Sequence, residues 1–406
     1  MRILFVSHYF HPEVGAPQTR ILETAQLLSD RGHDVTVLTG FPNYPDGMIP
    51  EGYRRRLLVR ERMGNIRVLR ALVYPAPNRG FARRLVNHAS FSISSVLASP
   101  MAGRPEVVIA ESPPLFTAVS AVAIARAWRA PLMLNVADLW PESAVQLGML
   151  RNPRAIRLAE ILERFAYRHS AAITVPTAGM RTTLLRDGVP ADRAVHLPNA
   201  VDPGRFAGGP PRGSDPRRVI YCGTVGMAQG VGTLIDAAAE LASAENGAPT
   251  RFEFLIVGDG AEREELMRKT IEQGLTNVHF EGRVDRSKVP GLIASADLAV
   301  LCLRDVPLFE DALPTKMLEY MAASRPVVAA AAGDAARLLE RSDAGIACPP
   351  GDPAALAASL TEAMRDPVRA ERMGANGRRY VQEHCSRETF VDKLEAIAAR
   401  LAGQRQ

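Results

Sequence analysis

The chain is poor in cysteine, lysine and tryptophan and has no long apolar run. Of its 406 residues, four are cysteines and two are tryptophans. Two of the cysteines lie in apolar stretches and none forms a C-x-x-C pair, which favours buried reduced thiols, and hence the cytoplasm, over disulfides or a metal centre. No run of eighteen apolar residues occurs, and the opening "MRILFVSHYF" is typical of a first β-strand, so we expect no membrane span.

Several common cofactor motifs are also missing. The first loop has only Gly15 where a dinucleotide fold needs G-x-G-x-x-G, and no G-x-x-x-x-G-K-[ST] is present. Glycines at 223, 226, 230 and 232 have other spacings but allow backbone N–H groups to approach a phosphate. No D-x-D pair exists, and His8 and His11 have no third ligand. We therefore expect neither cofactor nor metal, with helix N-termini and basic side chains in place of a cation.

Positive charge is concentrated in residues 51–84, here called the basic zone. The formal net charge of the chain is +5, whereas ten arginines and two glutamates give this zone +8 (10 − 2). Apolar residues among or next to these charges include Leu57, Leu58, Val59, Phe81 and Leu85. Such a pattern fits an anionic membrane surface, and the alternative is a solvated arginine-rich face. Because no recognition motif accompanies the charge, we expect no nucleic-acid partner.

Strands and helices alternate in two series along a chain too long for one core. The first series opens with an apolar strand, Arg2–Ser7, then a helix and a second strand, which form a βαβ unit of a buried parallel sheet. The series restarts at "RRVIYCGT" after the linker-like "AGGPPRGSDPRR". We predict two doubly wound α/β domains, 1–203 and 204–385, with ligand crevices at the strands' carboxyl ends. A last helix within 386–406 is expected to pack back on the first domain.

The stretch "EDALPTKMLEYMAASRPVV" (310–328) joins a proline turn to a short helix and a buried strand. Thr315, Lys316 and Glu319 would share one face beside the helix N-terminus, since residues three and four apart are neighbours on a helix. Free N–H groups and partial positive charge make such an end suitable for a phosphate. The alternative is a surface Lys–Glu pair worth a few tenths of a kcal/mol.

Six segments in this order resemble glycosyltransferase family 4: "HPEVGAPQTRILETAQLLSDRGHDVTVLTGFPNYP", "DLWPES", "LPNAVD", "GDGAEREEL", "VHFEGRV" and "LPTKMLEYMAASRPVV". The chain is most similar to the branch that builds O-antigen and exopolysaccharide units, typified by fucosamine transferases. The resemblance implies the GT-B fold, in which two Rossmann-like domains face a central cleft. It also implies a nucleotide-sugar donor in the second domain, an acceptor in the first, and retaining, metal-independent transfer.

The resemblance assigns roles to individual residues. Glu319 would bind the ribose hydroxyls, Asp311 with the adjacent Glu310 would contact the donor sugar, and Lys316 would stabilise the departing diphosphate. Gly15 would let the first domain's backbone approach the donor phosphate. The other positions assigned to the donor are Gly223 and Thr224 after a strand, Gln229, Arg283 and Val284 at the base, and Leu313, Pro314 and Thr315 at the diphosphate.

On the acceptor side, Asp138 and Glu142 in "ADLWPES" would orient the acceptor hydroxyl. The alternative is that Asp138 caps the following turn while Trp140 and Pro141 pack. The transfer would be a front-side attack in which the donor phosphate takes the acceptor proton, so that catalysis consists of positioning and electrostatic stabilisation.

Three positions depart from the family pattern. Thr224 and Gln229 stand where many relatives have an Arg and a Lys, so Lys316, with Arg283, would have to supply that charge. Ala137 replaces a His before Asp138, which puts a His-based role near the acceptor in doubt. Ser324 replaces a small Gly, a change that we interpret as structural.

The expected function is transfer of an N-acetylated amino or deoxy sugar from a nucleotide-sugar, UDP-linked, to a lipid-linked saccharide. The enzyme would work in the cytoplasm at the inner membrane face. One alternative is a natural-product glycosyltransferase with a soluble small-molecule acceptor. Two others are a nucleotide-sugar epimerase and a non-catalytic sugar-nucleotide-binding protein.

Overall fold

The computed structural model describes residues 1–404 apart from 14, 45, 77–80, 210, 212, 214 and 245–250. The chain forms two compact units. Unit 1 comprises Met1–Pro176, Met180–Leu197 and Phe390–Gln406, and unit 2 comprises Thr177–Gly179 and Pro198–Thr389. Among the described residues, no helix is both long and apolar enough to cross a membrane.

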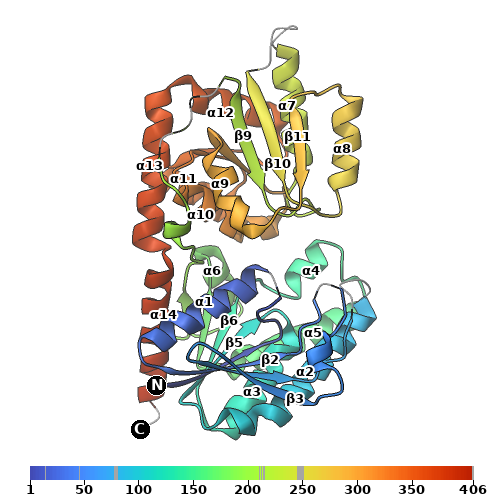
Figure 1. Cartoon of the computed structure of the whole chain (residues 1–406), viewed down its shortest axis with the longest axis vertical. Helices are drawn as coiled ribbons and strands as arrows, with labels where there is room; N and C mark the ends of the chain where they lie inside the picture. Colours follow the sequence, from blue (N-terminus) through green and yellow to red (C-terminus); the bar gives the residue numbers. More distant parts are fainter. Residues whose placement is uncertain are drawn as a thin grey trace. The chain divides into compact units, whose positions relative to one another are not determined.

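Unit 1 is built on an eight-stranded sheet of order β3-β4-β2-β1-β5-β6-β7-β8. All neighbouring strands are parallel except β3, which pairs antiparallel with β4 at the sheet edge. The strands are β1 Arg2–Ser7, β2 Asp34–Gly40, β3 Leu58–Met63, β4 Ile66–Ala71, β5 Val107–Ser112, β6 Leu132–Val136, β7 Ala172–Val175 and β8 Ala194–His196. The helices that lie wholly or mostly in this unit are α1 Ala16–Asp30, α2 Phe81–Ala98, α3 Leu115–Ala127, α4 Glu142–Gln146, α5 Pro153–Arg168, α6 Ala178–Arg186 and α14 Arg387–Gly403 (Figure 1).

The central strands of unit 1 are apolar along almost their whole length because helices cover both faces of a parallel sheet. Five of the six β1 residues are buried, and β5 and β6 contribute Val108, Ala110, Leu132 and Leu134 to the same core. The chain leaves β1 for β2 on one side and reaches β5 on the other. This change of direction is the switch point at which a doubly wound sheet opens a crevice.

The C-terminal helix α14 is tied to unit 1 by ion pairs. Glu395 accepts a hydrogen bond from Arg31 at 2.7 Å and lies 2.8 Å from Nε2 of His33. Asp392 lies 2.8 Å from a second nitrogen of Arg31. Arg31 and His33 flank the turn between α1 and β2, so the last helix closes against the first βαβ unit.

Unit 2 has a six-stranded, all-parallel sheet of order β11-β10-β9-β12-β13-β14. The strands are β9 Arg217–Cys222, β10 Phe252–Val257, β11 Val278–Gly282, β12 Leu298–Cys302, β13 Val327–Ala330 and β14 Gly345–Cys348. The helices are α7 Gly232–Ala244, α8 Arg263–Glu272, α9 Val289–Ala294, α10 Thr315–Ala322, α11 Gly333–Ser342, α12 Pro353–Arg365 and α13 Pro367–His384 (Figure 1). The switch point of this sheet lies between β9 and β12.

The predicted fold class, two doubly wound α/β units, is confirmed. All four cysteines are free and buried, as expected. The β3–β4 hairpin was not predicted, since its arginines were interpreted only as a basic zone. It turns through Gly64, whose φ of 59° is the left-handed conformation that glycine adopts most readily. Of the basic zone, Arg79 and the Phe81 side chain lie outside the described part.

Candidate active site

The candidate donor site lies at the switch point of unit 2, where β9 ends. Gly223 follows β9 with a φ of 150°, and a Cβ at this position would lie 2.7 Å from Nζ of Lys316. Both the backbone angle and the close approach favour glycine here. The sequence predicted that the backbone at Gly223 could approach a phosphate, and in the structure this backbone lies next to the Lys316 ammonium.

Two further glycines bring the β9 and β10 loops into direct backbone contact. A Cβ on Gly258 would lie 1.8 Å from the Gly223 carbonyl oxygen, and one on Gly260 would lie 2.1 Å from that of Val225. The Gly223 N–H donates to the Val257 carbonyl at 2.9 Å, and the Val225 N–H to that of Asp259 at 3.0 Å. These contacts fix the loop that carries Gly223 and Thr224.

Lys316 has a buried hydroxyl, not a carboxylate, as its partner. Its Nζ donates to the Tyr221 hydroxyl at 2.7 Å and lies 4.3 Å from the centre of that ring, and Tyr221 donates to the Thr224 carbonyl at 2.6 Å. Burial lowers the pKa of Lys316 from 10.5 to about 8, an effect opposed by Cys302, Cys222 and Glu319. In the described residues Lys316 forms no ion pair, so the surface Lys–Glu pair considered above is wrong.

Glu319 lies one turn after Lys316 on α10 and is partly buried. Burial raises the pKa of its carboxyl group, while Arg286 and Lys316 act in the opposite direction. Oε1 of Glu319 lies 3.7 Å from Nη2 of Arg286, in the segment that follows β11. The distance is long for an ion pair and the Arg286 side chain is about half exposed, so the Glu319 carboxylate can still accept hydrogen bonds from hydroxyl groups.

Arg286 and two buried tyrosines of this site were missed in the sequence. Tyr320 is fully buried, and its hydroxyl accepts the Cys222 N–H at 2.8 Å and donates to the Cys222 carbonyl at 3.1 Å. Tyr320 thus ties α10 to the end of β9, and Tyr221 orients Lys316. The sequence around each tyrosine carried only a weak functional signal, because a tyrosine in an apolar strand or helix is ordinarily a core residue.

The remaining donor-side residues are less closely grouped. Thr224, Arg283 and Glu310 are exposed, whereas Gln229, Asp311, Leu313, Pro314 and Thr315 are partly buried. Val284 and Leu313 pack against the core of unit 2. The backbone of Glu310 is held against Gly333, where a Cβ would lie 1.8 Å from the Glu310 carbonyl oxygen. Thus Gly223, Thr224, Lys316 and Glu319 come together where β9 ends and α10 begins.

In unit 1, Gly15 is placed at the start of α1. Its carbonyl accepts the N–H and the hydroxyl of Thr19 at 3.1 and 3.0 Å. A Cβ on Gly15 would lie 2.3 Å from the side-chain oxygen of Gln18. The backbone of Gly15 is extended, with a φ of 176°, so a larger residue here would displace the end of the Gln18 side chain without straining the backbone.

Asp138 and Glu142 follow β6. Burial raises the pKa of Asp138, and hydrogen bonds from Ser143 and the Leu139 N–H oppose this shift. These bonds to the next turn agree with the capping alternative, which does not prevent contact with a ligand. Glu142 begins α4 and accepts a hydrogen bond from Gln146 at 2.9 Å.

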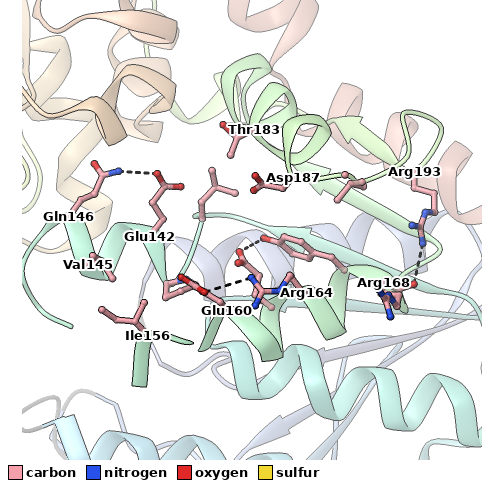
Figure 2. A pocket seen from close by; sticks show the side chains of 16 residues that line it. Glu142, Val145, Gln146, Ile156, Glu160, Arg164, Arg168, Thr183, Asp187 and Arg193 are labelled. Atoms are coloured by element: carbon pink, nitrogen blue, oxygen red, sulfur yellow. Dashed lines mark hydrogen bonds and ion pairs between the residues drawn. The ribbon is translucent and has the colours of Figure 1, made fainter. Parts of the chain in front are cut away.

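Glu142 lines a cavity of about 700 Å³ between α4, α5 and α6 (Figure 2). The apolar part of its wall comes from Leu139, Val145, Ile156 and Val189, and the acidic part from Glu142, Glu160, Glu163 and Asp187. Glu160 lies 3.7 Å from Arg164. In the described residues the other three carboxylates form no ion pair. The volume is in the range of small-ligand pockets.

Glu163 is the most perturbed carboxyl group of this cavity. It accepts the Tyr167 hydroxyl at 2.8 Å. Burial raises its pKa from 4.5 to about 7, with Asp187 and Glu142 adding to the effect. Its side chain is therefore partly protonated at neutral pH.

Among the described residues, no group of three or more His, Cys, Asp and Glu side chains is arranged to hold a metal ion. His8 is buried, and its Nε2 forms a hydrogen bond with Asn87 at 2.7 Å.

Two doubly wound units, with a lysine ammonium at the switch point of the second, fit the class of sugar-nucleotide transferases, and the comparisons with known proteins agree. Residues 15–200 match the "glycosyl transferase 4-like domain" and residues 216–366 match "glycosyl transferases group 1". The chain belongs to this family of glycosyltransferases, which confirms the resemblance in its motifs. It is therefore an enzyme that transfers a sugar from a nucleotide-sugar.

Three similar proteins illustrate the range of the family. WcaI of Escherichia coli strain K12, described as a colanic acid biosynthesis glycosyl transferase, is 25% identical over 79% of this chain and 81% of its own. The 2-deoxystreptamine N-acetyl-D-glucosaminyltransferase of Streptomyces fradiae is 28% identical over 91% and 90%. The structure of Anabaena HepE in complex with UDP-glucose has a TM-score of 0.71 at 20% identity, covering 98% of this chain and all of HepE.

The pKa of Glu163 gives a test of this geometry. A carboxyl group whose pKa rises on folding contributes stability that is lost as the pH increases from 4.5 to about 7. We expect Glu163→Gln to match the wild type in stability near pH 4.5 and to exceed it by on the order of 1–3 kcal/mol at pH 8, measured by urea unfolding. The control Glu160→Gln removes a partner of Arg164 and should not stabilise. An equal effect of Glu163→Gln at both pH values would contradict the assignment.

Proposed function

We propose that this protein is a retaining, metal-independent glycosyltransferase that transfers an N-acetylated amino or deoxy sugar from a UDP-sugar to a lipid-linked saccharide in the cytoplasm. The observation that carries the donor side is the half-buried Lys316 side chain, whose ammonium has no carboxylate partner in the described residues. A cation that is partly withdrawn from water in this way gains from an anion that can reach it. The diphosphate of the donor is that anion.

The surroundings of Lys316 support this role. Gly223 leaves the ammonium uncovered, since any side chain there would occupy the space next to Nζ. The first N–H groups of α10 lie beside it and add partial positive charge. A leaving diphosphate would gain the most from these groups when its charge develops, which is how electrostatic catalysis lowers a barrier.

Glu319 supports the nucleoside part of the proposal. It lies one helical turn from Lys316, so a carboxylate stands a few ångströms from the phosphate position, where the ribose of a bound nucleotide would lie. Asp311 and Glu310 would then face the sugar, and Arg283 and Val284 the base. Asp138 and Glu142 would orient the acceptor hydroxyl.

For the acceptor, two observations point in different directions. The basic zone of unit 1 and the similarity to WcaI favour a lipid-linked saccharide at the inner face of a membrane. The carboxylates of the cavity in unit 1, together with the similarity to the Streptomyces fradiae enzyme, favour a soluble acceptor that carries amino groups. We keep the second as the alternative, and transfer assays with both acceptor types decide between them.

The donor is tested by thermal shift with UDP-, GDP- and dTDP-sugars, since a ligand of the folded state raises its apparent stability. We expect a UDP-sugar to give the largest shift. Glu319→Ala should weaken UDP binding by about 1.5–3 kcal/mol, or roughly 10- to 150-fold, through loss of charge-assisted bonds to the ribose. Calorimetry measures this effect, with Glu340→Ala on α11 as the control. Unchanged UDP affinity in folded Glu319→Ala would remove Glu319 from the site.

Lys316→Met keeps the length of the side chain and removes its charge. We expect turnover to fall about a hundred- to a thousandfold, as for the loss of one electrostatic contact to a developing charge. Because the pKa of Lys316 is about 8, the wild type should bind UDP less tightly as the pH rises through 8, and the variant should lack this dependence. Turnover within a few-fold of the wild type would place the role on another residue.

Metal independence follows from the proposed use of Lys316 and helix N–H groups in place of a cation. We expect full transfer activity in EDTA, and no more than a small change on adding Mg²⁺ or Mn²⁺. Activity that disappears in EDTA and returns with either ion would show that a divalent cation shares the diphosphate.

A further inference from the structure

Unit 1 exposes a group of large apolar side chains around the end of β4. Leu57, Ile93 and Leu97 are 78%, 65% and 75% exposed, and Leu72, Tyr74 and Met101 are also exposed. We call these six residues the apolar patch. Single exposed apolar residues are common, whereas a group of this size marks an interaction surface.

Hydrogen bonds bring the segments that carry Leu57, Leu72 and Tyr74 together beside α2. The Leu72 N–H donates to the Leu57 carbonyl at 3.0 Å. On α2, the Ser94 hydroxyl donates to the Leu72 carbonyl at 2.6 Å, and the Ser90 hydroxyl accepts the Tyr74 N–H at 2.8 Å. The segments before β3 and after β4 therefore lie beside α2.

On α2 itself the exposed apolar residues follow the helical repeat. Val86, Ile93 and Leu97 are seven and four residues apart, with Ser90 between them, and so they share one face. Val86 is exposed as well, so this face of α2 extends the patch toward the N-terminal end of the helix.

Arginines border the patch. Arg54, Arg55 and Arg56 immediately precede Leu57, and Arg83 lies in the first turn of α2, three residues before Val86; all four are exposed. We call these four the arginine rim. The nearby acidic residue Glu51 lies 3.9 Å from Arg54, at the outer limit of an ion pair.

Only some residues of the basic zone are exposed enough to contact a membrane. Leu58 and Val59 pack against the core of unit 1 and are unavailable as anchors. Arg70 is buried and donates to Glu61 at 2.7 Å, while Arg67 donates to Asp34 at 2.9 Å. The apolar contribution therefore comes mainly from Leu57, Leu72 and α2, in part from residues outside the zone.

The charge of the rim decides between occupants. A second copy of this chain bound through the same face in a symmetric dimer would bring one arginine rim against the other. A surface with negative charge spread over an apolar interior matches both the rim and the patch. An anionic lipid bilayer has this chemistry.

We propose that the apolar patch and the arginine rim dock unit 1 on an anionic membrane surface, with Ile93 and Leu97 in the interface and the arginines at the headgroups. The purpose of this docking rests on the proposed lipid-linked acceptor, although the binding itself does not require transfer. Binding is reversible, since the patch is shallow and the electrostatic part weakens within a Debye length.

The experiment measures sedimentation of the full chain with vesicles of phosphatidylcholine alone and with about 30% phosphatidylglycerol. The wild type should bind only the anionic vesicles, and salt should weaken the binding. Ile93→Ser/Leu97→Ser should bind at least about tenfold more weakly. Replacing Arg54, Arg55 and Arg56 by Ser should weaken binding about a hundredfold and remove most of the salt dependence.

The matched control is Ile271→Ser/Val368→Ser, which alters two unit 2 side chains that are each 76% exposed, as Leu97 nearly is. It should bind as the wild type does. Thermal unfolding of every variant checks the fold, and transfer to a short soluble acceptor should be unchanged in the patch variant.

Four outcomes would overturn the proposal. They are absence of vesicle binding, equal binding to neutral vesicles, wild-type binding by the patch variant, and a dimer that the patch variant abolishes. The result also separates this proposal from the proposed function. Vesicle binding without transfer to any lipid-linked acceptor would support the docking surface and contradict the proposed acceptor. Transfer to a lipid-linked acceptor without vesicle binding would support the proposed acceptor and contradict the docking surface.

Discussion

The candidate donor site of unit 2 depends on the hydrogen bond from the Lys316 ammonium to the Tyr221 hydroxyl near the end of β9. Tyr221 orients the ammonium, Tyr320 ties α10 to the Cys222 backbone, and Gly223 leaves the space into which Nζ projects. Burial lowers the pKa of this ammonium, and an anion that reaches it would stabilise the charged form. Strand, loop and helix thus converge on one charge whose natural complement is a phosphate.

The sequence predicted most of the fold because the spacing of apolar residues along a strand or helix reflects which of them are buried. The apolar runs at Arg2–Ser7 and Arg217–Cys222 are both strands of parallel sheets. The β3–β4 hairpin was missed because β3 is an edge strand in which the charged Glu61 lies between the exposed Arg60 and Arg62, so apolar and polar residues do not alternate there. Burial of Arg70 could not be foreseen either, since its partner Glu61 lies on the opposite strand of that hairpin.

The candidate site was likewise predicted only in part. Lys316 and Glu319 were found because a proline turn, a helix start and two charged residues occur together within a few positions. Arg286 and Tyr221 were not, since they approach α10 only after β9 and β11 have been placed in the sheet. The carboxylates of the unit 1 cavity come from α4, from α5 and, in Asp187, from the residue that follows α6. Spacing along the chain carries no information about such a convergence, which depends on helix packing over a sheet.

The ion pairs of α14 also constrain the order in which the protein can fold during synthesis. Arg31 and His33 leave the ribosome early, whereas Asp392 and Glu395 are made only after the whole of unit 2 has been translated. Unit 2 can therefore complete its sheet first, while unit 1 still lacks its last helix. Since domains generally fold as they emerge, the earlier-made unit of this chain would be the later one to reach its final form, and a chain stalled before residue 390 would present the uncovered α1–β2 turn to the cell's chaperones.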